Sequence, residues 1–585
     1  MTPGSPSFDC LRRSLDKLQD NTSLAYNSAS LYTLIPSCFT WSDLASELAR
    51  AEDQNKPQRL IALRACLEVK TNVLSLSKAD AAPRRQIRRF VGRILTPVDD
   101  AEYDADVTHG GDNEERRNQV AKRCRTFAED GLIVLERAGP PIFSGDEKDE
   151  EDEEDEEDED AAQADAQIVH TITALADAGQ PWTTDLAAEK AKQMLADYFG
   201  PGNTNKQQWI VDSILKQYLR PLFARARPAA VTASGRKAAY VSQDTDRGAI
   251  GTENGESPQA KPWKYVDLRA ISVFAWAVHE ATGELVRVHW PLFTPVLLAL
   301  VDDPDTAVRA RGLALLERFV ATALDGGCPL HTTGLDSVLA DAVFPTLHFL
   351  PRLTPEKESL QLLPPAYAAL LGLVKAGAAA GSIKLGGGHS GKNLPQKPGR
   401  TLLDRMLREG IYSGYFYASE HIHIVEELMR QTGRIVEAMG VYAVKHLKDL
   451  MPIYAAILTD PFAMRYKPAV AATVDALQAT MAACWPRIAR TPWQEEIIKM
   501  LMLSWLHVVE DEEQEKASKA NKTRVRTAKT EAKDLSMRLI HATDTLFAIL
   551  KAAGVEIAPT IDVLVNSDSR LTALFLKNRA AQGRS

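Results

Sequence analysis

The sequence lacks the features on which several large protein classes depend. Its six cysteines lie far apart and form no Cys-x-x-Cys pair, which argues against a zinc ribbon or a dithiol motif and predicts buried, reduced thiols. No apolar run approaches the ~20 residues needed to cross a bilayer. The N-terminal stretch MTPGSPSFDCLRRSLDKL has no apolar signal core. We therefore expect a soluble, intracellular protein without membrane contact.

Catalytic and ligand-binding motifs are also missing. No nucleophile elbow, His-Glu-x-x-His helix or kinase signature occurs. The segment 386–393 (GGGHSGKN) comes close to a phosphate-binding loop, but Asn393 stands where a Ser or Thr would hold magnesium. His421 and His423 are two residues apart, so they point to different faces of a helix and suit no metal. The sequence thus predicts no enzyme activity, no cofactor and no metal site.

Charge is concentrated in one tract. The net charge is −9, yet residues 146–160 alone hold fourteen acidic residues and one lysine, so the rest of the chain is slightly basic. No global basic excess supports nucleic-acid binding. The tract is either a solubilising spacer or a docking segment for a basic partner. Ser144, followed by Gly-Asp-Glu, fits the preference of an acidophilic kinase of the casein kinase two type and is a candidate phosphorylation site.

Strand signals are sparse, and helical periodicity dominates what is present. In the stretch 300–320 (LVDDPDTAVRARGLALLERFV) an apolar run, an Asp-Pro turn and a second apolar stripe follow one another. Pro304 suits the first position of a new helix, and Asp303 can cap that helix. The apolar residues of the second stripe recur at helical spacing. They are Val308, Leu315, Leu316 and Phe319. The stretch predicts two helices folded back on each other.

The same hairpin recurs. The segment 452–461 (PIYAAILTDP) repeats the spacing of 295–304 (PVLLALVDDP), and a looser copy over 343–374 turns at Pro355 and Glu356. One hairpin cannot bury both its faces, so it needs neighbours of the same kind. The copies have no clean period, and we predict an all-α, irregular helical-repeat solenoid. Its structural turn residues include Asp303, Pro304, Asp460 and Pro461.

Composition divides the chain into six parts. Like charges prevent burial in the acidic tract, and turn formers gather in the loops. The predicted parts are an N-terminal helical region 1–143, a disordered acidic linker 144–166, a helical segment 167–224, a flexible loop 225–261, a helical core 262–510 interrupted by a loop 376–400, and a charged connector with C-terminal helices 511–585. The connector is polar all round and fits either a solvated helix or a disordered segment.

Several segments carry a resemblance to a known family. DPDTAVR (303–309) resembles the turn of HEAT repeats, in which Asp303 and Arg309 would form an inter-repeat ladder. Longer segments resemble the Tel-two-interacting protein two (Tti-two) family, in a fungal-type form. These segments are 262–278, 289–319, 343–371, 402–462 and 484–490. The family belongs to the Triple T (TTT) co-chaperone complex.

The resemblance implies a function. It implies a HEAT-like solenoid that acts as a non-enzymatic scaffold and pairs with the other TTT subunits, Tel-two and Tti-one. With the ninety-kilodalton heat-shock chaperone and its R-two-T-P co-chaperone, the complex matures the phosphatidylinositol-kinase-related protein kinases (PIKKs), which govern DNA-damage, telomere and TOR signalling. A cytoplasmic and nuclear location follows from the same resemblance.

The stretch 410–450 is our candidate for a partner-binding surface. Its aromatic and histidine side chains exceed what a simple buried stripe needs, although core packing is the alternative. The candidate residues are Tyr412, Tyr415, Phe416, Tyr417, His421 and His446. Two other classes stay open: a karyopherin-like transport solenoid, which should be longer and more regular, and an enzyme with an unrecognised site.

Overall fold

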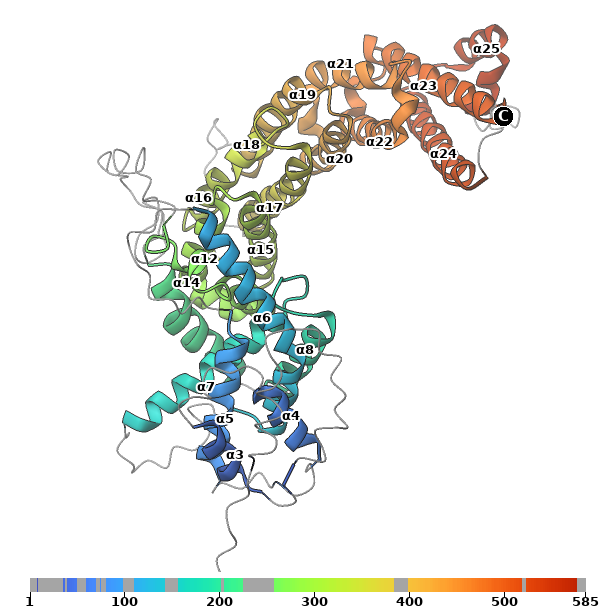
Figure 1. Ribbon diagram of the computed structural model, residues 1–585. Helices are drawn as coiled ribbons and strands as arrows, with labels where there is room; N and C mark the ends of the chain where they lie inside the picture. The colour runs from blue at the N-terminus through green and yellow to red at the C-terminus, as the bar shows by residue number, and fades with distance from the viewer. Residues whose placement is uncertain are drawn as a thin grey trace, which may run out of the picture. The chain divides into compact units, whose positions relative to one another are not determined.

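The structure is a computed structural model, shown in Figure 1. It describes residues 8, 35–36, 39–49, 59–69, 74, 80–97, 110–141, 156–200, 205–224, 257–382, 398–517 and 522–575. Within these ranges the regular structure is helical, and β pairing is limited to one isolated bridge between Pro351 and Thr354. This confirms the prediction of an all-α chain. Ser144, the acidic residues 146–155 and the glycine-rich segment 386–393 lie outside the described residues.

The described residues form two compact units, the first ending at Val296 and the second beginning at Leu297. The sequence analysis instead began the main helical core at residue 262. Residues 262–296 pack with the N-terminal helices because the helix α13 contacts the helix α7. The bounds of the first unit's helices are α3 Trp41–Leu48, α4 Arg59–Val69, α5 Ala81–Leu95, α6 Gly110–Arg137, α7 Glu156–Leu175, α8 Asp185–Tyr198, α9 Asn205–Trp209, the π-helix η2 Ile210–Leu219, α10 Arg220–Leu222, α12 Pro262–Tyr265 and α13 Ala270–Glu280; α14 Gly283–Val301 crosses the division.

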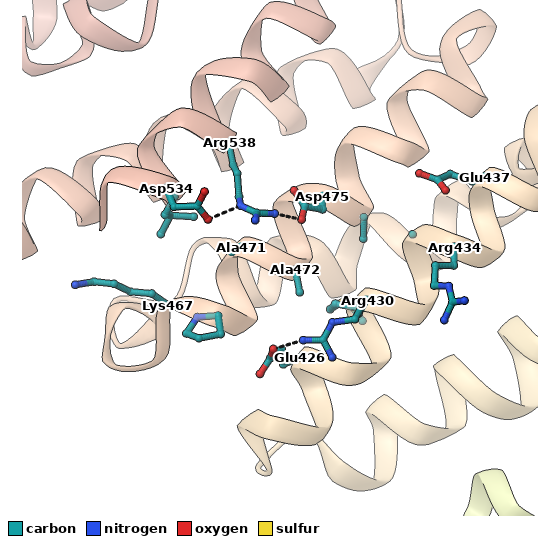
Figure 2. Close-up of a pocket in the computed structure, with 15 residues that line it drawn as sticks. Glu426, Arg430, Arg434, Glu437, Lys467, Ala471, Ala472, Asp475, Asp534 and Arg538 are labelled. Carbon is teal, nitrogen blue, oxygen red and sulfur yellow. Dashed lines mark hydrogen bonds and ion pairs between the residues drawn. The ribbon is translucent and has the colours of Figure 1, made fainter. Parts of the chain in front are cut away.

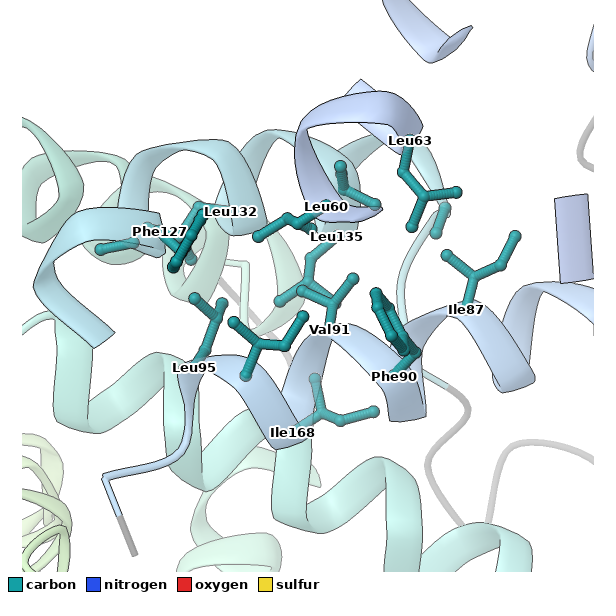
Figure 3. Packing of buried hydrophobic residues seen from close by; sticks show 14 of the residues in the cluster. Leu60, Leu63, Ile87, Phe90, Val91, Leu95, Phe127, Leu132, Leu135 and Ile168 are labelled. Carbon is teal, nitrogen blue, oxygen red and sulfur yellow. The ribbon is translucent and has the colours of Figure 1, made fainter. Parts of the chain in front are cut away.

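The first unit is built from two layers of helices. One layer is the succession α3, α5, α7 and α13, and the other is α4, α6 and α8, with α6 packed against α5. Buried aliphatic and aromatic side chains from both layers meet between them, as Figure 3 shows for α4, α5, α6 and α7. Leu60, Ile87 and Leu132 are fully buried there. Removing such surface from water is the main force that holds the two layers together.

The helix α7 corrects the predicted acidic linker. It begins at Glu156, so the prediction of disorder for 144–166 is wrong over 156–166. Asp165 anchors this helix, because its carboxylate pairs with the buried Arg88 of α5 at 2.9 Å.

The second unit is a two-layer array of helical hairpins. Its bounds are α15 Thr306–Asp325, α16 Leu335–Val343, η5 Phe344–His348, α17 Glu356–Ser382, α18 Pro398–Arg405, the π-helix η6 Met406–Tyr412, α19 Ser413–Ala418, α20 Ile422–Met439, η7 Gly440–His446, α21 Leu447–Leu458, η8 Ala463–Tyr466, α22 Lys467–Cys484, η9 Trp485–Arg487, α23 Pro492–Ala517, α24 Lys522–Ala552, α25 Ala558–Ser567 and η10 Ser569–Leu571. The second helices of successive hairpins, α15, α17, α20, α22 and α24, each contact the next and form what we call the B layer. This succession is the HEAT-like solenoid that the sequence predicts.

The Asp-Pro turn forms where predicted, but its cap differs. The helix α15 begins at Thr306, and its N-cap is Asp305, whose carboxylate accepts from the amides of Ala307 and Val308. Asp303 is instead buried and accepts from the amide of Asp305 at 3.0 Å. Pro304 therefore lies in the turn, two residues before the helix, and not at its first position. Asp460 plays the same part at the later turn, where it accepts from the amide of Phe462.

The predicted loop 376–400 is shorter than expected. The helix α17 continues to Ser382 and α18 begins at Pro398, so the interruption predicted for 376–400 is helical at both ends. The charged connector after residue 510 is helical up to Ala517 and again from Lys522, which fits the solvated-helix alternative.

The helix α14 is more apolar than the sequence analysis allowed. It has 19 residues, and an 18-residue window of it has a mean hydropathy of 1.4, long and apolar enough to span a membrane by these two criteria. However, 56% of that window is buried inside the protein, as in the core helix of a soluble domain. Among the described helices, no other passes the same test.

Candidate protein-binding surface

Two of the predicted partner-binding residues are part of the internal structure. Tyr412 hydrogen-bonds through its hydroxyl to His446 Nδ1 at 3.0 Å, and His446 Nε2 lies 2.9 Å from Asp404 Oδ1. His446 is only 2% exposed. Although burial raises the pKa of Asp404, hydrogen bonds from His446 and Lys445 outweigh it and lower that pKa. The network ties η6 to η7. Burial removes His446 from the candidate surface, whereas Tyr412 is half-buried and held in the network.

The other predicted residues lie at a turn on one edge of the second unit. Phe416 and Tyr417, at the end of α19, are 76% and 52% exposed and pack edge to face on each other. Large exposed apolar side chains also occupy the turn before it and the turn after it. We call the whole set the turn row. Its members are Leu353, Phe416, Tyr417, Ile422 and Phe462.

Contacts between neighbouring hairpins place these three turns side by side. His421 Nδ1 lies 3.2 Å from a carboxylate oxygen of Glu356, which links the turn after α19 to the start of α17. On the other side, the ring of His423 meets the ring of Tyr466 edge to face, with centroids 4.5 Å apart. The hydroxyl of Tyr466 donates to Glu426 at 2.6 Å. The members of the turn row therefore lie on three neighbouring turns of three successive hairpins.

The polar side chains around the turn row carry both signs. Arg352, Lys357 and Arg465 are exposed, and so are Glu420 and Asp460. Tyr415 is half-buried beneath the row; its burial, and then the charge of Asp460, raise the pKa of its phenol. Because no single sign dominates, the apolar side chains decide what the row can bind. Exposed apolar patches with a polar rim are typical of protein–protein contacts.

A second feature is a groove in the B layer, formed by α20, α22 and α24. Its volume is about 490 Å³, and small residues such as Gly433 and Ala472 form part of its lining. Several of its charged side chains pair with one another, as Figure 2 shows for Arg538 between Asp534 and Asp475 and for Arg430 beside Glu426. We call it the B-layer groove, and its internal ion pairs leave little net charge to attract a ligand.

The histidine pair at residues 421 and 423 makes contacts on two different sides of the turn. Their rings contact Glu356 and Tyr466 respectively, in different directions. Across the described residues no group of three or more His, Cys, Asp or Glu side chains could hold a metal ion.

The predicted repeat-turn residue Arg309 has a scaffold role. Its guanidinium donates to the main-chain oxygens of Asp303 and Asp302 at 3.0 and 3.2 Å and to the hydroxyl of Thr346 in the next hairpin at 3.3 Å. It also lies over the ring of Phe349, 4.4 Å from the centroid. The side chain thus joins two adjacent hairpins, as a repeat ladder does.

Comparison with known proteins identifies the family. The model of the Tti2 family matches residues 168–465, about half of the chain. The chain belongs to the Tti2 family. Membership gives it a general role as a subunit of the TTT complex. The whole turn row lies inside the matched segment, whereas the B-layer groove extends beyond it through Asp475 and Arg538.

The remaining comparisons add no functional information about this Tti2-family chain. No curated protein matches it. Among solved structures, an engineered protein is 13% identical, with 85% of this chain and 98% of that chain covered at a TM-score of 0.33. Importin beta is 11% identical, with 96% of this chain and 66% of that chain covered at a TM-score of 0.32. At these TM-scores the likeness carries no argument about partners or activity.

Sequence reasoning missed three members of the turn row. Leu353 lies between two prolines, Ile422 begins α20, and Phe462 follows an Asp-Pro pair. Each is a large apolar residue at or beside a turn between helices, a place where the chain gains nothing from burial inside the hairpin. A large apolar residue at such a turn is the sequence feature that could have identified all three.

Proposed function

We propose that this Tti2-family chain acts as a non-enzymatic scaffold of the TTT complex and supports the chaperone-dependent assembly of PIKKs. The observation that carries the proposal is the family match over 168–465. A two-layer array of hairpins supports it physically, because such an array offers a long surface for another folded protein. The predicted partners Tel-two and Tti-one, and the predicted cytoplasmic and nuclear location, belong to the same proposal.

The turn row is the part of this scaffold that we assign to another TTT subunit. Its five exposed side chains lie on three adjacent turns within the matched segment. An apolar strip of a partner's helical surface would bury them, and its rim charges of both signs would set the register. In such interfaces a few aromatic anchors carry most of the binding energy. Phe416 and Phe462 are the natural anchors here.

A tagged pull-down from the chain's own cells tests this assignment. The amount of partner subunit recovered with a Phe416→Ser/Phe462→Ser double variant should fall by about tenfold or more relative to the natural chain, because the variant removes two anchors. The matched control is Val563→Ser, which changes a side chain 69% exposed in α25, outside the row and outside the family match. Both variants should keep the natural far-ultraviolet circular dichroism spectrum.

The proteins that return decide the class of function. Recovery of two large helical subunits and a chaperone in near-equal amounts supports the scaffold. Recovery of a small GTPase together with cargo proteins would instead establish the transport alternative. If the TTT subunits return equally with the double variant and the control, the turn row is not their binding surface.

A further inference from the structure

The turn before α17 contains a sequence that the scaffold role does not explain. Residues 352–357 read RLTPEK, in which Thr354 is followed by a proline and, three positions on, by Lys357. Proline-directed protein kinases act on a Ser or Thr that directly precedes Pro, and a basic residue three positions after the acceptor favours one large subset of them. The chain has seven Ser-Pro or Thr-Pro pairs, and Thr354 is the acceptor that has a basic residue at this position.

The structure leaves this segment open to an enzyme. Leu353 is 91% exposed, and Arg352, Pro355 and Lys357 are exposed as well. Thr354 is half-buried, in an isolated bridge with Pro351 and not inside a helix. Kinases bind their substrates as extended chains, and only the first turn of α17 would have to open. Opening that turn gives up the hydrogen bonds that the Pro355 carbonyl accepts from the amides of Glu358 and Ser359, at a helix end, where helices unwind most easily.

The other Thr-Pro pairs in the described residues have hydroxyls that are buried or hydrogen-bonded. Thr294 is completely buried inside α14. The hydroxyl of Thr96 donates to the main-chain oxygen of Gly92 at 2.6 Å. The hydroxyl of Thr491 lies 2.8 Å from the main-chain oxygen of Ile488. Thr96 and Thr491 are half-buried like Thr354, so the sequence pattern, and not exposure alone, selects Thr354.

We propose that Thr354 is the acceptor site of a proline-directed kinase, and that its phosphorylation releases the partner from the turn row. The Oγ1 atom of Thr354 would form a bond to the γ-phosphorus of ATP, the bond from that phosphorus to ADP would break, and the hydroxyl proton would leave to the kinase's base. The second half of the proposal rests on the proposed function.

The place of Thr354 in the turn row gives the phosphate its effect. The residue directly follows Leu353, a member of the row, and precedes Glu356, which contacts His421 of the next turn. A phosphate adds between one and two negative charges at neutral pH. A partner that covers the row with an apolar strip would remove this phosphate charge from water, which costs desolvation free energy. No fixed cation on the row fully offsets that cost. Arg352 and Lys357 are exposed and hydrated, so they neutralise it only in part.

Two measurements on the full chain test the two halves separately. First, the purified chain is incubated with a cyclin-dependent kinase and ATP, and the phosphate is mapped by mass spectrometry. The natural chain and a Thr491→Ala control should gain a phosphate at Thr354, and Thr354→Ala should not. Absence of phosphate at Thr354 in the natural chain overturns the site, whatever the row binds.

Second, the pull-down is repeated with Thr354→Glu and Thr354→Val. The charged variant should retain about tenfold less partner, and Thr354→Val should match the natural chain. Equal retention by both variants overturns the release, and loss with both shows a structural effect instead. If Phe416→Ser/Phe462→Ser also keeps its partners, the turn row is not their binding surface. The mapping of the phosphate to Thr354 does not depend on that result.

Discussion

At the scale of single residues, His170 is a strongly perturbed titratable group of the first unit. Its ring stacks on Tyr218 with centroids 4.5 Å apart, and its Nε2 lies 3.2 Å from the hydroxyl of Ser213. Burial, and then the positive charge of Arg269, lower the pKa of His170 to about 3. In an unfolded chain a histidine has a pKa of about 6.5. Between these two pKa values the imidazole of His170 is therefore neutral in the folded state and protonated in the unfolded state.

This difference predicts a loss of stability in mild acid. Above about pH 6.5 neither state binds the proton, and below it the unfolded state gains about 1.4 kcal/mol per pH unit until the folded pKa is reached. Between pH 7 and pH 5 the natural chain should therefore lose about 2 kcal/mol more unfolding free energy than His170→Phe. Urea denaturation at the two pH values measures it, with His331→Gln, at a half-exposed position, as the control. Equal losses in the natural chain and in His170→Phe would refute the assignment.

Single residues also show where sequence reasoning reached its limit. Tyr412 and Phe416 are four apart and share a face of the helical segment, yet one is held in a network with His446 and the other is 76% exposed. Helical spacing determines on which face of a helix a side chain lies, but it does not determine whether the next hairpin covers that side chain. The same limit applies at the Asp-Pro turn, where local rules favour Asp303 as the cap. Arg309 binds the main-chain oxygens of Asp302 and Asp303, and the helix starts later.

At the scale of elements, the order of the hairpins was predictable because it depends on local signals. The apolar stripes of α15 and α22 are buried as their spacing indicates, for example at Phe319 and Leu477. Composition did not predict α7, because its like charges favour disorder, whereas the ion pair of Asp165 with Arg88 joins residues far apart in sequence. Hairpin order thus follows from the sequence, and helix ends follow from packing.

A close approach of the helices α14 and α15 gives a second prediction. A Cβ atom added at Gly312 of α15 would lie 2.7 Å from Leu300 Cβ and 2.9 Å from the main-chain carbon of Leu300 in α14. That backbone cannot move without shifting a helix, so Gly312→Ala should destabilise the chain by about 1–3 kcal/mol despite the better helix propensity of alanine. Thermal unfolding measures the change.

Gly433 of α20 provides the matched control. A Cβ there would meet Ala476 Cα at 3.5 Å, an ordinary contact. Gly433→Ala should therefore be neutral or stabilising by up to about 1 kcal/mol. A Gly312→Ala chain as stable as Gly433→Ala would show that α14 and α15 are not packed as described.

At the scale of the whole molecule, two surfaces of the second unit could hold a partner, and they differ in physical character. The turn row is apolar with a mixed rim, whereas the B-layer groove is lined by ion pairs such as that of Arg538 with Asp534, 2.8 Å apart. The family match includes the whole row and only part of the groove. A variant in the groove can separate them without disturbing those pairs. Arg434 suits this purpose, because it lines the groove and its guanidinium donates to the side-chain oxygen of Gln431 at 3.3 Å.

The salt dependence of partner binding also distinguishes the turn row from the B-layer groove. Exposed charges are screened over about 8 Å at physiological ionic strength and over less as salt rises, whereas apolar burial is not weakened by it. Partners held by the turn row should therefore stay bound when sodium chloride is raised from ~150 to ~500 mM in the pull-down, and Arg434→Glu should retain them as well as the natural chain does. Loss of the partners at high salt, or with Arg434→Glu alone, would place the contact in the B-layer groove. Because Phe416→Ser/Phe462→Ser acts only on the row, the three results together assign the partner to one surface.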